Sequence, residues 1–215
     1  MDKRKHLTLA EIERLLSVVR QSKYGVRDEC MILMCFFHGL RVSELTRLKM
    51  SDIDLDGGNI YIRRLKHGLC TTHPLRLEEA GYLRQWLTCR QKWKGAESGW
   101  LFLSRLGSVL TRQHFYLLLR QYGIAAGLTV TIHPHMLRHA CGYALADNGA
   151  DTRLIQDYLG HKNIRHTVIY TATNAERFSG IWEKKTGKNL TFWPKLKASI
   201  RKVLPNANIS YIFVY

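Results

Sequence analysis

Hydrophobic residues recur at helical spacing along most of the chain. LAEIERLLSVV follows Thr8, and Thr8 together with Glu11 forms the capping pattern that begins a helix. A second apolar stretch, RDECMILMCFFHGL, ends at Gly39, and RVSELTRL predicts a short helix directly after it. This first part of the chain is therefore predicted to be helical.

Between residues 51 and 75 the pattern changes to the alternation that is typical of strands. SDIDLDGG has the composition of a turn, NIYIRRLK at residues 59–66 alternates between apolar and polar positions, and TTHPL at residues 71–75 can return beside it. The pattern predicts a β-hairpin with Lys66 at its tip.

The remainder up to about residue 186 again predicts helices. Residues 76–94 form an amphipathic pattern, WLFLS predicts a short extended piece, and the chain from Thr111 onward is nearly all helical. Residues typical of helix ends mark the later helices: Thr111, Pro134, Asp151, Gly160 and Asn163.

The last thirty residues do not continue this pattern. They are basic, then interrupted by a proline, and they end in an apolar aromatic heptad. We expect a mainly α fold with a small antiparallel β-hairpin. One domain would span residues 1–185, and residues 186–215 would form a basic C-terminal tail without a core of its own.

Composition narrows the class of protein. There are 33 Lys and Arg residues against 17 Asp and Glu, a formal net charge of +16, and more than half of the excess lies after residue 100. Such a surplus favours a polyanionic partner, most often nucleic acid. The five cysteines form no CxxC pair, which predicts free thiols. Without a membrane-spanning apolar run or a signal peptide, we expect a cytoplasmic protein with no membrane partner.

The stretch HPHMLRHACGYALAD places cationic groups on one face of a helix. His135, Arg138 and His139 fall within an arc of about 100° on a helical wheel, with Gly142 and Ala146 under the same arc. The opposite face is apolar, so the cationic face is expected to receive an anion. His139 is expected to hold this helix against a neighbour, without a part in the chemistry.

Four other polar residues stand out, and each has a purely structural explanation. Arg41 could pair with Glu44 one turn on, Lys66 could be solvated, His161 could end a helix and Tyr170 could belong to the core. Together with His135 and Arg138, however, they form a set suited to attack a phosphodiester without a metal. Guanidinium groups bind phosphate oxygens, imidazole and ammonium groups move protons, and a phenol can be the nucleophile.

Metal sites are less well supported by the residues. His135 and His139 have zinc spacing, but Arg138 lies between them and no Glu follows His135. DIDLDGG begins like a calcium loop, yet its twelfth position is Arg63 instead of a glutamate. No cluster of carboxylates suggests a two-metal nuclease. We expect neither a metal nor a cofactor.

Several of these motifs resemble one known family. GLRVSEL, the hairpin lysine, HPHMLRH, and LIQDYLGH with the tyrosine that follows resemble the catalytic domain of the tyrosine recombinases, the phage integrase family. The resemblance covers roughly residues 5–185, and RLKHGLCTTHPL and IHPHMLRHACGYALAD resemble the bacterial fimbrial phase-variation recombinases. The family pattern of Arg, Lys, His-x-x-Arg, His or Trp, and Tyr is filled here, in order, by Arg41, Lys66, His135, Arg138, His161 and Tyr170.

The resemblance implies a mechanism for these six residues. Tyr170 would attack the scissile phosphate and form a 3′-phosphotyrosine, Lys66 would protonate the leaving 5′ oxygen, and His135 would assist proton transfer. The phosphate would be held by Arg41, Arg138 and His161. Since the protein–DNA ester conserves the bond energy, neither ATP nor a metal is needed.

The resemblance also implies partners and leaves alternatives. It predicts a site-specific DNA recombinase, an invertase for fimbrial phase variation, that acts as a homotetramer on double-stranded DNA with inverted-repeat target sites and with accessory DNA-bending proteins. Most family members carry a helical DNA-binding domain before the catalytic domain, and the short N-terminal segment here resembles the fimbrial group. A non-catalytic DNA-binding regulator, or degenerate recombinase, and a type IB topoisomerase remain as alternatives.

Overall fold

The computed structural model describes residues 4–64 and 70–172 of the 215-residue chain. These residues belong to one compact unit that spans residues 1–177. Lys66 lies outside the described residues, as do the predicted domain boundary at residue 185 and the predicted tail at residues 186–215.

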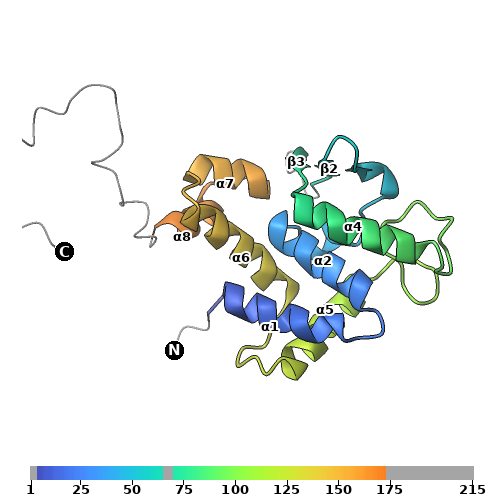
Figure 1. Cartoon of the computed structure of the whole chain (residues 1–215). Coiled ribbons are helices and arrows are strands. Elements are labelled where there is room, and N and C mark those ends of the chain that lie inside the picture. Colours follow the sequence, from blue (N-terminus) through green and yellow to red (C-terminus); the bar gives the residue numbers. More distant parts are fainter. Residues whose placement is uncertain (1–3, 65–69, 173–215) are drawn as a thin grey trace, which may run out of the picture. The chain divides into compact units, whose positions relative to one another are not determined.

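The regular elements of the described part of the chain are eight α-helices, one short 3₁₀-helix (Met50–Asp52) and one small sheet (Figure 1). The helices are α1 (Leu9–Arg20), α2 (Gly25–Phe37), α3 (Val42–Leu45), α4 (Leu77–Arg90), α5 (Arg112–Ala125), α6 (Pro134–Asp147), α7 (Thr152–Leu159) and α8 (Arg165–Thr171). None of these helices is both long enough and apolar enough to cross a membrane. The predicted mainly α fold with a small antiparallel sheet is confirmed.

The sheet has three strands, one more than the sequence predicted. They are β1 (Ile53–Asp54), β2 (Asn59–Ile62) and β3 (Thr71–Pro74), paired antiparallel in the order β1-β2-β3. Ile60 and Ile62 of β2 are fully buried while Tyr61 between them is exposed, as the alternation predicts. The strand β1 lies in the predicted turn, and two residues are too few to show an alternating pattern.

Helix ends follow the capping residues closely. The side chains of Thr8, Thr111 and Asp151 each accept a hydrogen bond from a backbone N–H in the first turn of α1, α5 and α7. At α8 the helix begins two residues after Asn163, whose Oδ1 accepts from the N–H of Arg165 at 2.9 Å. The predicted local signals therefore set the element boundaries to within a residue or two.

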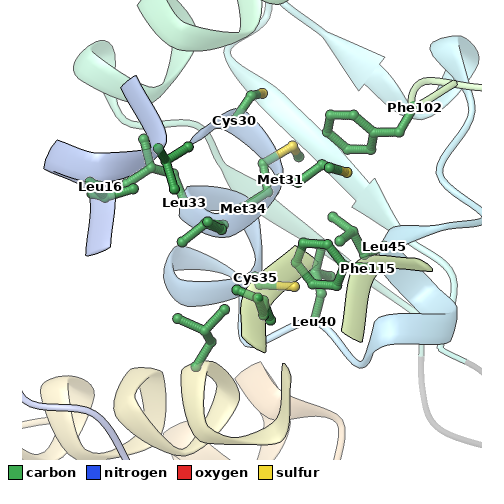
Figure 2. Packing of buried hydrophobic residues seen from close by; sticks show 14 of the residues in the cluster. Leu16, Cys30, Met31, Leu33, Met34, Cys35, Leu40, Leu45, Phe102 and Phe115 are labelled. Atoms are coloured by element: carbon green, nitrogen blue, oxygen red, sulfur yellow. The ribbon is translucent and has the colours of Figure 1, made fainter. Parts of the chain in front are cut away.

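Helix α2 forms the centre of the larger hydrophobic core. Every residue from Cys30 to Cys35 is buried, so this helix is apolar around its whole circumference. Figure 2 shows Met31, Met34 and Cys35 of α2 among side chains from other elements, including Leu16 of α1 and Phe115 of α5. The neighbouring helices and the sheet therefore cover α2 from several sides.

A smaller hydrophobic cluster holds α6, α7 and α8 together. It consists of Cys141, Ala146, Ile155, Leu159 and Tyr170, and Figure 1 shows these three helices side by side. Helix α6 also contributes Met136, Leu137 and Ala140 to the larger core. The helix that carries the cationic face is thus shared between both clusters.

Strand β3 is tied to the helices by buried polar groups. His38 Nε2 lies 2.6 Å from Glu79 Oε1, and its Nδ1 lies 3.2 Å from Nδ1 of His73 in β3. His73 Nε2 in turn lies 3.0 Å from the hydroxyl of Thr71. His38, His73 and Glu79 are each almost wholly buried, so this polar chain fixes the strand against α2 and α4.

The segment between α4 and α5 is organised by one buried arginine. Arg90, at the end of α4, donates hydrogen bonds to the carbonyl groups of Ala96, Ser98, Trp100 and Leu101. Its side chain therefore satisfies acceptors that no helix or strand would pair. Arg90 thus joins four carbonyl groups of this segment, and the indole N–H of Trp86 donates to that of Leu101 as well.

Replacement of this arginine should destabilise the whole unit. In Arg90→Met the aliphatic stem remains while the half-buried carbonyl groups of Ala96, Ser98 and Trp100 lose their donor, so we expect the free energy of unfolding to fall by about 3 kcal/mol. Urea unfolding followed by circular dichroism measures this free energy. Arg84→Met on the exposed side of α4 is the matched control. Equal stability of the two variants would contradict this role of Arg90.

Candidate active site

Helix α6 presents its cationic face to a cavity of about 1000 Å³. The cavity is bounded by the start of α3, by α6 and α8, and by α7 with the loop that follows it. Five of the six predicted site residues line it: Arg41, His135, Arg138, His161 and Tyr170. The structure therefore brings together residues that are up to 129 positions apart in the sequence.

Arg41 is held at the start of α3 by the pairing that its spacing suggested. Its Nη1 lies 2.7 Å from Oε1 of Glu44, and its backbone N–H donates to Oε2 of the same carboxylate at 2.9 Å. The side chain is still 29% exposed and lines the cavity. The ion pair with Glu44 is therefore compatible with a role at the cavity, because it fixes the position of the Arg41 guanidinium there.

Glu44 also reaches two further guanidinium groups. Arg64 Nη1 lies 2.9 Å and Arg138 Nη1 4.0 Å from its Oε2. Burial alone would raise the pKa of Glu44, but Arg64 and the hydrogen bonds from Arg41 outweigh it, and the pKa lies below its ordinary value. Three guanidinium groups around one carboxylate leave two positive charges in excess at this side of the cavity.

Sequence reasoning overlooked Arg64. It directly follows the exposed Arg63, and the alternation of the strand turns it inward, where it is 5% exposed. Its Nη2 donates to the carbonyl of Tyr158 at 2.5 Å, in addition to the ion pair with Glu44. An arginine at an inward position of a predicted strand was the available signal.

Arg138 is oriented by two backbone carbonyl groups. Its Nη1 donates to the carbonyl of Gly39, and its Nη2 donates to that of Leu159 at 2.7 Å. Gly39 has a φ of 56°, and a Cβ there would collide with Leu159, so only glycine suits this position. Burial, then Arg41 and Arg64, lower the pKa of Arg138 to about 10, so it is charged at neutral pH.

His161 is placed by the end of α7. Gly160 adopts the left-handed conformation that ends this helix, and the N–H of His161 donates to the carbonyl of Gln156 at 3.0 Å. Nδ1 of His161 lies 2.9 Å from the hydroxyl of Thr167. When that hydroxyl donates to Nδ1, the ring proton is on Nε2, which can donate to an anion. Burial and then Arg138 lower the pKa of His161 to about 3, so the ring is neutral at neutral pH.

Tyr170 lies in the small cluster with its hydroxyl at the cavity. The residue is 1% exposed, and its ring lies directly over Gly142, where a Cβ would come within 2.7 Å of Cζ. The ring of Tyr143 meets it edge-on at 5.2 Å between centroids. Burial raises the pKa of Tyr170 to about 12, with Arg138 opposing, so the phenol keeps its proton at neutral pH.

His139 contacts the hydroxyl of that tyrosine. Its Nδ1 lies 2.9 Å from the oxygen of Tyr170, so the neighbour that it holds α6 against is α8. Sequence reasoning placed His139 on the correct face, but only the fold shows which atom it meets. His135, one turn earlier, is exposed, and its ring lies 4.8 Å from that of His139 between centroids.

The sequence of the chain matches the phage integrase family over residues 5–177. This match covers more than half of the chain, and it includes every residue of the pattern from Arg41 to Tyr170. The chain belongs to the phage integrase family. The predicted resemblance to the tyrosine recombinases is therefore confirmed.

A relative and two solved structures show how far the similarity extends. Type 1 fimbriae regulatory protein FimB of Escherichia coli (strain K12) is 55% identical over 186 residues, which are 86% of this chain and 93% of that protein. The crystal structure of XerA recombinase is similar with a TM-score of 0.73 at 27% identity over 85% of this chain and 65% of that one. The XerH site-specific recombinase bound to difH in a post-cleavage complex is similar with a TM-score of 0.69 at 28% identity. The match covers 83% of this chain and 53% of that one.

These similarities confirm the predicted class of enzyme. The chain is a site-specific recombinase of the tyrosine type, and it is similar to the fimbrial phase-variation recombinases. Its fold is that of the catalytic domain of this class.

The contact between Gly142 and Tyr170 generates a prediction about activity. In Gly142→Ala the new methyl group must displace the phenol ring, so we expect the rate of DNA strand cleavage to fall by roughly 10²-fold. Single-turnover cleavage of a labelled duplex measures this rate, and thermal unfolding checks that the fold persists.

The matched control is the same change on another helix. Gly81 of α4 has no atom within 4 Å of an added Cβ, so Gly81→Ala should stabilise the chain by about 0.5–1 kcal/mol and keep full activity. Cleavage by Gly142→Ala at the unchanged rate would show that the ring tolerates a shift or is not engaged in the chemistry.

Proposed function

We propose that the chain cuts and rejoins strands of double-stranded DNA through a 3′-phosphotyrosine formed on Tyr170. The observation that carries the proposal is the single cavity in which two arginines, two histidines and a tyrosine of the recombinase pattern converge. Lys66, the sixth residue, lies outside the described residues and is proposed on the resemblance alone.

The charges around the cavity suit the proposed transition state. A phosphodiester carries one negative charge, and the pentacoordinate transition state gains a second on its non-bridging oxygens. Arg41 and Arg138 lie on the cavity side of the cluster around Glu44, where two positive charges are in excess. Cations that are fixed before the reaction stabilise such a state without reorganisation. His161 would donate a further hydrogen bond.

The proposed reaction exchanges one ester for another. The oxygen of Tyr170 forms a bond to phosphorus as the bond to the 5′ oxygen breaks, and Lys66 protonates that oxygen. His135 remains partly exposed, but the protein around its ring displaces enough water to lower its pKa, and Arg138 lowers it further, so it would assist proton transfer as a neutral ring. Attack by the 5′-hydroxyl of a partner strand reverses the step, so no ATP and no metal takes part.

The basic surface supports double-stranded DNA as the partner. Cationic side chains from α7, from the loop that follows it and from the start of α8 lie at the cavity rim beside the proposed phosphate-binding residues: Arg153, Lys162 and Arg165. In duplex DNA, phosphates lie on both sides of a scissile bond, and cationic side chains of such a rim can contact them. The XerH structure is bound to its DNA substrate, and FimB is named a regulator of type 1 fimbriae. We therefore propose an invertase that switches a fimbrial promoter segment between inverted repeats.

The proposed assembly and domain organisation follow the family. Strand exchange needs two cut sites held together, which a homotetramer on DNA with accessory DNA-bending proteins would provide. We propose residues 1–185 as the catalytic domain and residues 186–215 as a basic tail. The family match, which ends at residue 177, supports a boundary in this region.

The nucleophile can be tested by trapping the covalent intermediate. The purified chain is incubated with a nicked duplex made from inverted repeats in the DNA next to its gene, and the adduct is resolved on a denaturing gel. Tyr170→Phe should abolish the adduct, because only the reacting oxygen is lost, while DNA binding stays near normal. Tyr143→Phe, which keeps the edge-on ring, is the matched control and should still form the adduct. An adduct that survives Tyr170→Phe would exclude Tyr170 as the nucleophile.

The same preparation separates the alternatives. A type IB topoisomerase would relax supercoiled plasmid and give no recombinant product. A non-catalytic regulator would bind DNA with a steep dependence on salt and form no adduct under any condition. Inversion of a plasmid-borne segment between the two repeats is the result that supports the proposal.

A further inference from the structure

We propose that Arg64 is a positioning residue for strand cleavage, which occupies the carboxylate of Glu44 so that Arg138 stays free to hold the scissile phosphate. The inference rests on the proposed function, in which Arg138 is one of the residues that bind this phosphate. Arg64 is not one of the six residues of the family pattern, and it is not among the described residues that line the cavity. It can therefore act on the reaction only through its neighbours.

The side chain of Arg64 is enclosed by protein behind the cavity. The residue follows β2 by two positions, and the exposed fraction of its side chain is 0%. A guanidinium removed from water in this way requires partners, since an unpaired buried charge is strongly unfavourable. Its Nη1 donates to Oε2 of Glu44 at 2.9 Å, and its Nη2 donates to the carbonyl of Tyr158 at 2.5 Å. These donors are therefore used inside the protein and are not available to a ligand.

The two oxygens of Glu44 are divided among the cations so that Arg138 is left without a carboxylate partner at hydrogen-bond distance. Oε1 accepts from Nη1 of Arg41 at 2.7 Å, and Oε2 accepts from Nη1 of Arg64 at 2.9 Å. Nη1 of Arg138 lies 4.0 Å from Oε2, too far for a hydrogen bond, and it donates instead to the neutral carbonyl of Gly39. The charge of Arg138 is therefore available to an anion in the cavity.

Removal of Arg64 would change this division. Burial alone would raise the pKa of Glu44, and Arg64 is the foremost of the groups that lower it instead. Without Arg64, Oε2 of Glu44 would lose this partner, and the guanidinium of Arg138 lies 4.0 Å away. Since a buried carboxylate is strongly destabilised by the loss of a partner, Arg138 would turn toward Glu44 and away from the phosphate.

Arg64 also contacts the backbone that orients Arg138. Its Nη2 donates to the carbonyl of Tyr158 near the end of α7 and lies 3.5 Å from the carbonyl of His38 at the end of α2. Arg138 donates to the carbonyl of the next residue in both places. The two guanidinium groups therefore bind successive carbonyls at the ends of two helices, so that Arg64 holds both supports of Arg138 in place.

The charge balance of the cluster provides a way to detect this role. Arg41, Arg64 and Arg138 around Glu44 leave two positive charges in excess, and without Arg64 one would remain. A phosphodiester passes from one negative charge to two as its transition state forms. A methylphosphonate, in which a methyl group replaces one non-bridging oxygen, is neutral and passes to one. A chain that has lost one positive charge should therefore be less impaired on the methylphosphonate.

The test measures single-turnover strand cleavage by the full-length chain, in saturating excess over the nicked duplex of the Tyr170 experiment. The duplex carries either the natural phosphodiester or a methylphosphonate at the scissile position. Arg64→Met removes the charge, whereas Arg64→Lys keeps a charge at Glu44 but loses the planar fork that binds the carbonyls. Both variants lose hydrogen bonds that support the fold, so the comparison between them isolates the charge. Arg63→Met is the matched control, because it removes the same charge from an exposed neighbour that pairs with Asp52 at 2.9 Å.

On the natural phosphodiester we expect Arg64→Met to cleave roughly 10²-fold more slowly than the unchanged chain, and Arg64→Lys to stay within about fivefold of it. Arg63→Met should match the unchanged chain. On the methylphosphonate the difference between Arg64→Met and Arg64→Lys should shrink to less than about tenfold. The ratio of the two rates within one preparation does not depend on the fraction of folded protein, so a loss of stability cannot produce this change.

The outcomes separate this inference from the proposed function. Equal rates for Arg64→Met and Arg64→Lys on the phosphodiester would show that Arg64 only supports the fold, and so would a difference that is the same on both substrates. Either result overturns the inference and leaves the proposed cleavage reaction intact. Absence of cleavage of the phosphodiester by the unchanged chain would overturn both.

Discussion

The carboxylate of Glu44 is the constraint on which the arrangement of the site depends. It lies in the interior, where an unpaired charge would be strongly unfavourable, and it is paired with Arg41 and Arg64 and approached by Arg138. Like charges gathered in so small a volume would repel one another without it. One buried anion therefore allows three cations to stay together with a surplus available for a phosphate.

The backbone around this cluster is adapted to it. Gly39 turns its carbonyl toward Arg138, and Gly160 ends α7 so that the carbonyl of Leu159 reaches the other arm of the same guanidinium. Arg64 packs against Gly160 from the sheet side, where a Cβ would lie 2.9 Å from its Nε. Two left-handed glycines thus bring the ends of α2 and α7 close enough to share one arginine.

Local signals in the sequence were sufficient for the elements but not for all contacts. Thr8, Thr111 and Asp151 act on residues within one turn, so their positions predicted the helix starts. The ordered pattern of cationic residues predicted the family. The positions of Arg64 and His139 depend on contacts with Glu44 and Tyr170, 20 and 31 residues away, which no periodicity encodes. The two-residue strand β1 was missed because its pairing with β2, rather than its own pattern, defines it.

The proposed nucleophile is carried by a helix of only seven residues, anchored to the rest by Thr167, Tyr170 and Thr171 while Val168 and Ile169 remain in solvent. So short a segment contributes little to the cooperative unfolding of the molecule and opens at a lower free energy than the core around α2. Withdrawal of the phenol from the cavity therefore requires only a subglobal fluctuation. The chain can be fully folded by any global measure and still spend part of its time without a nucleophile in place.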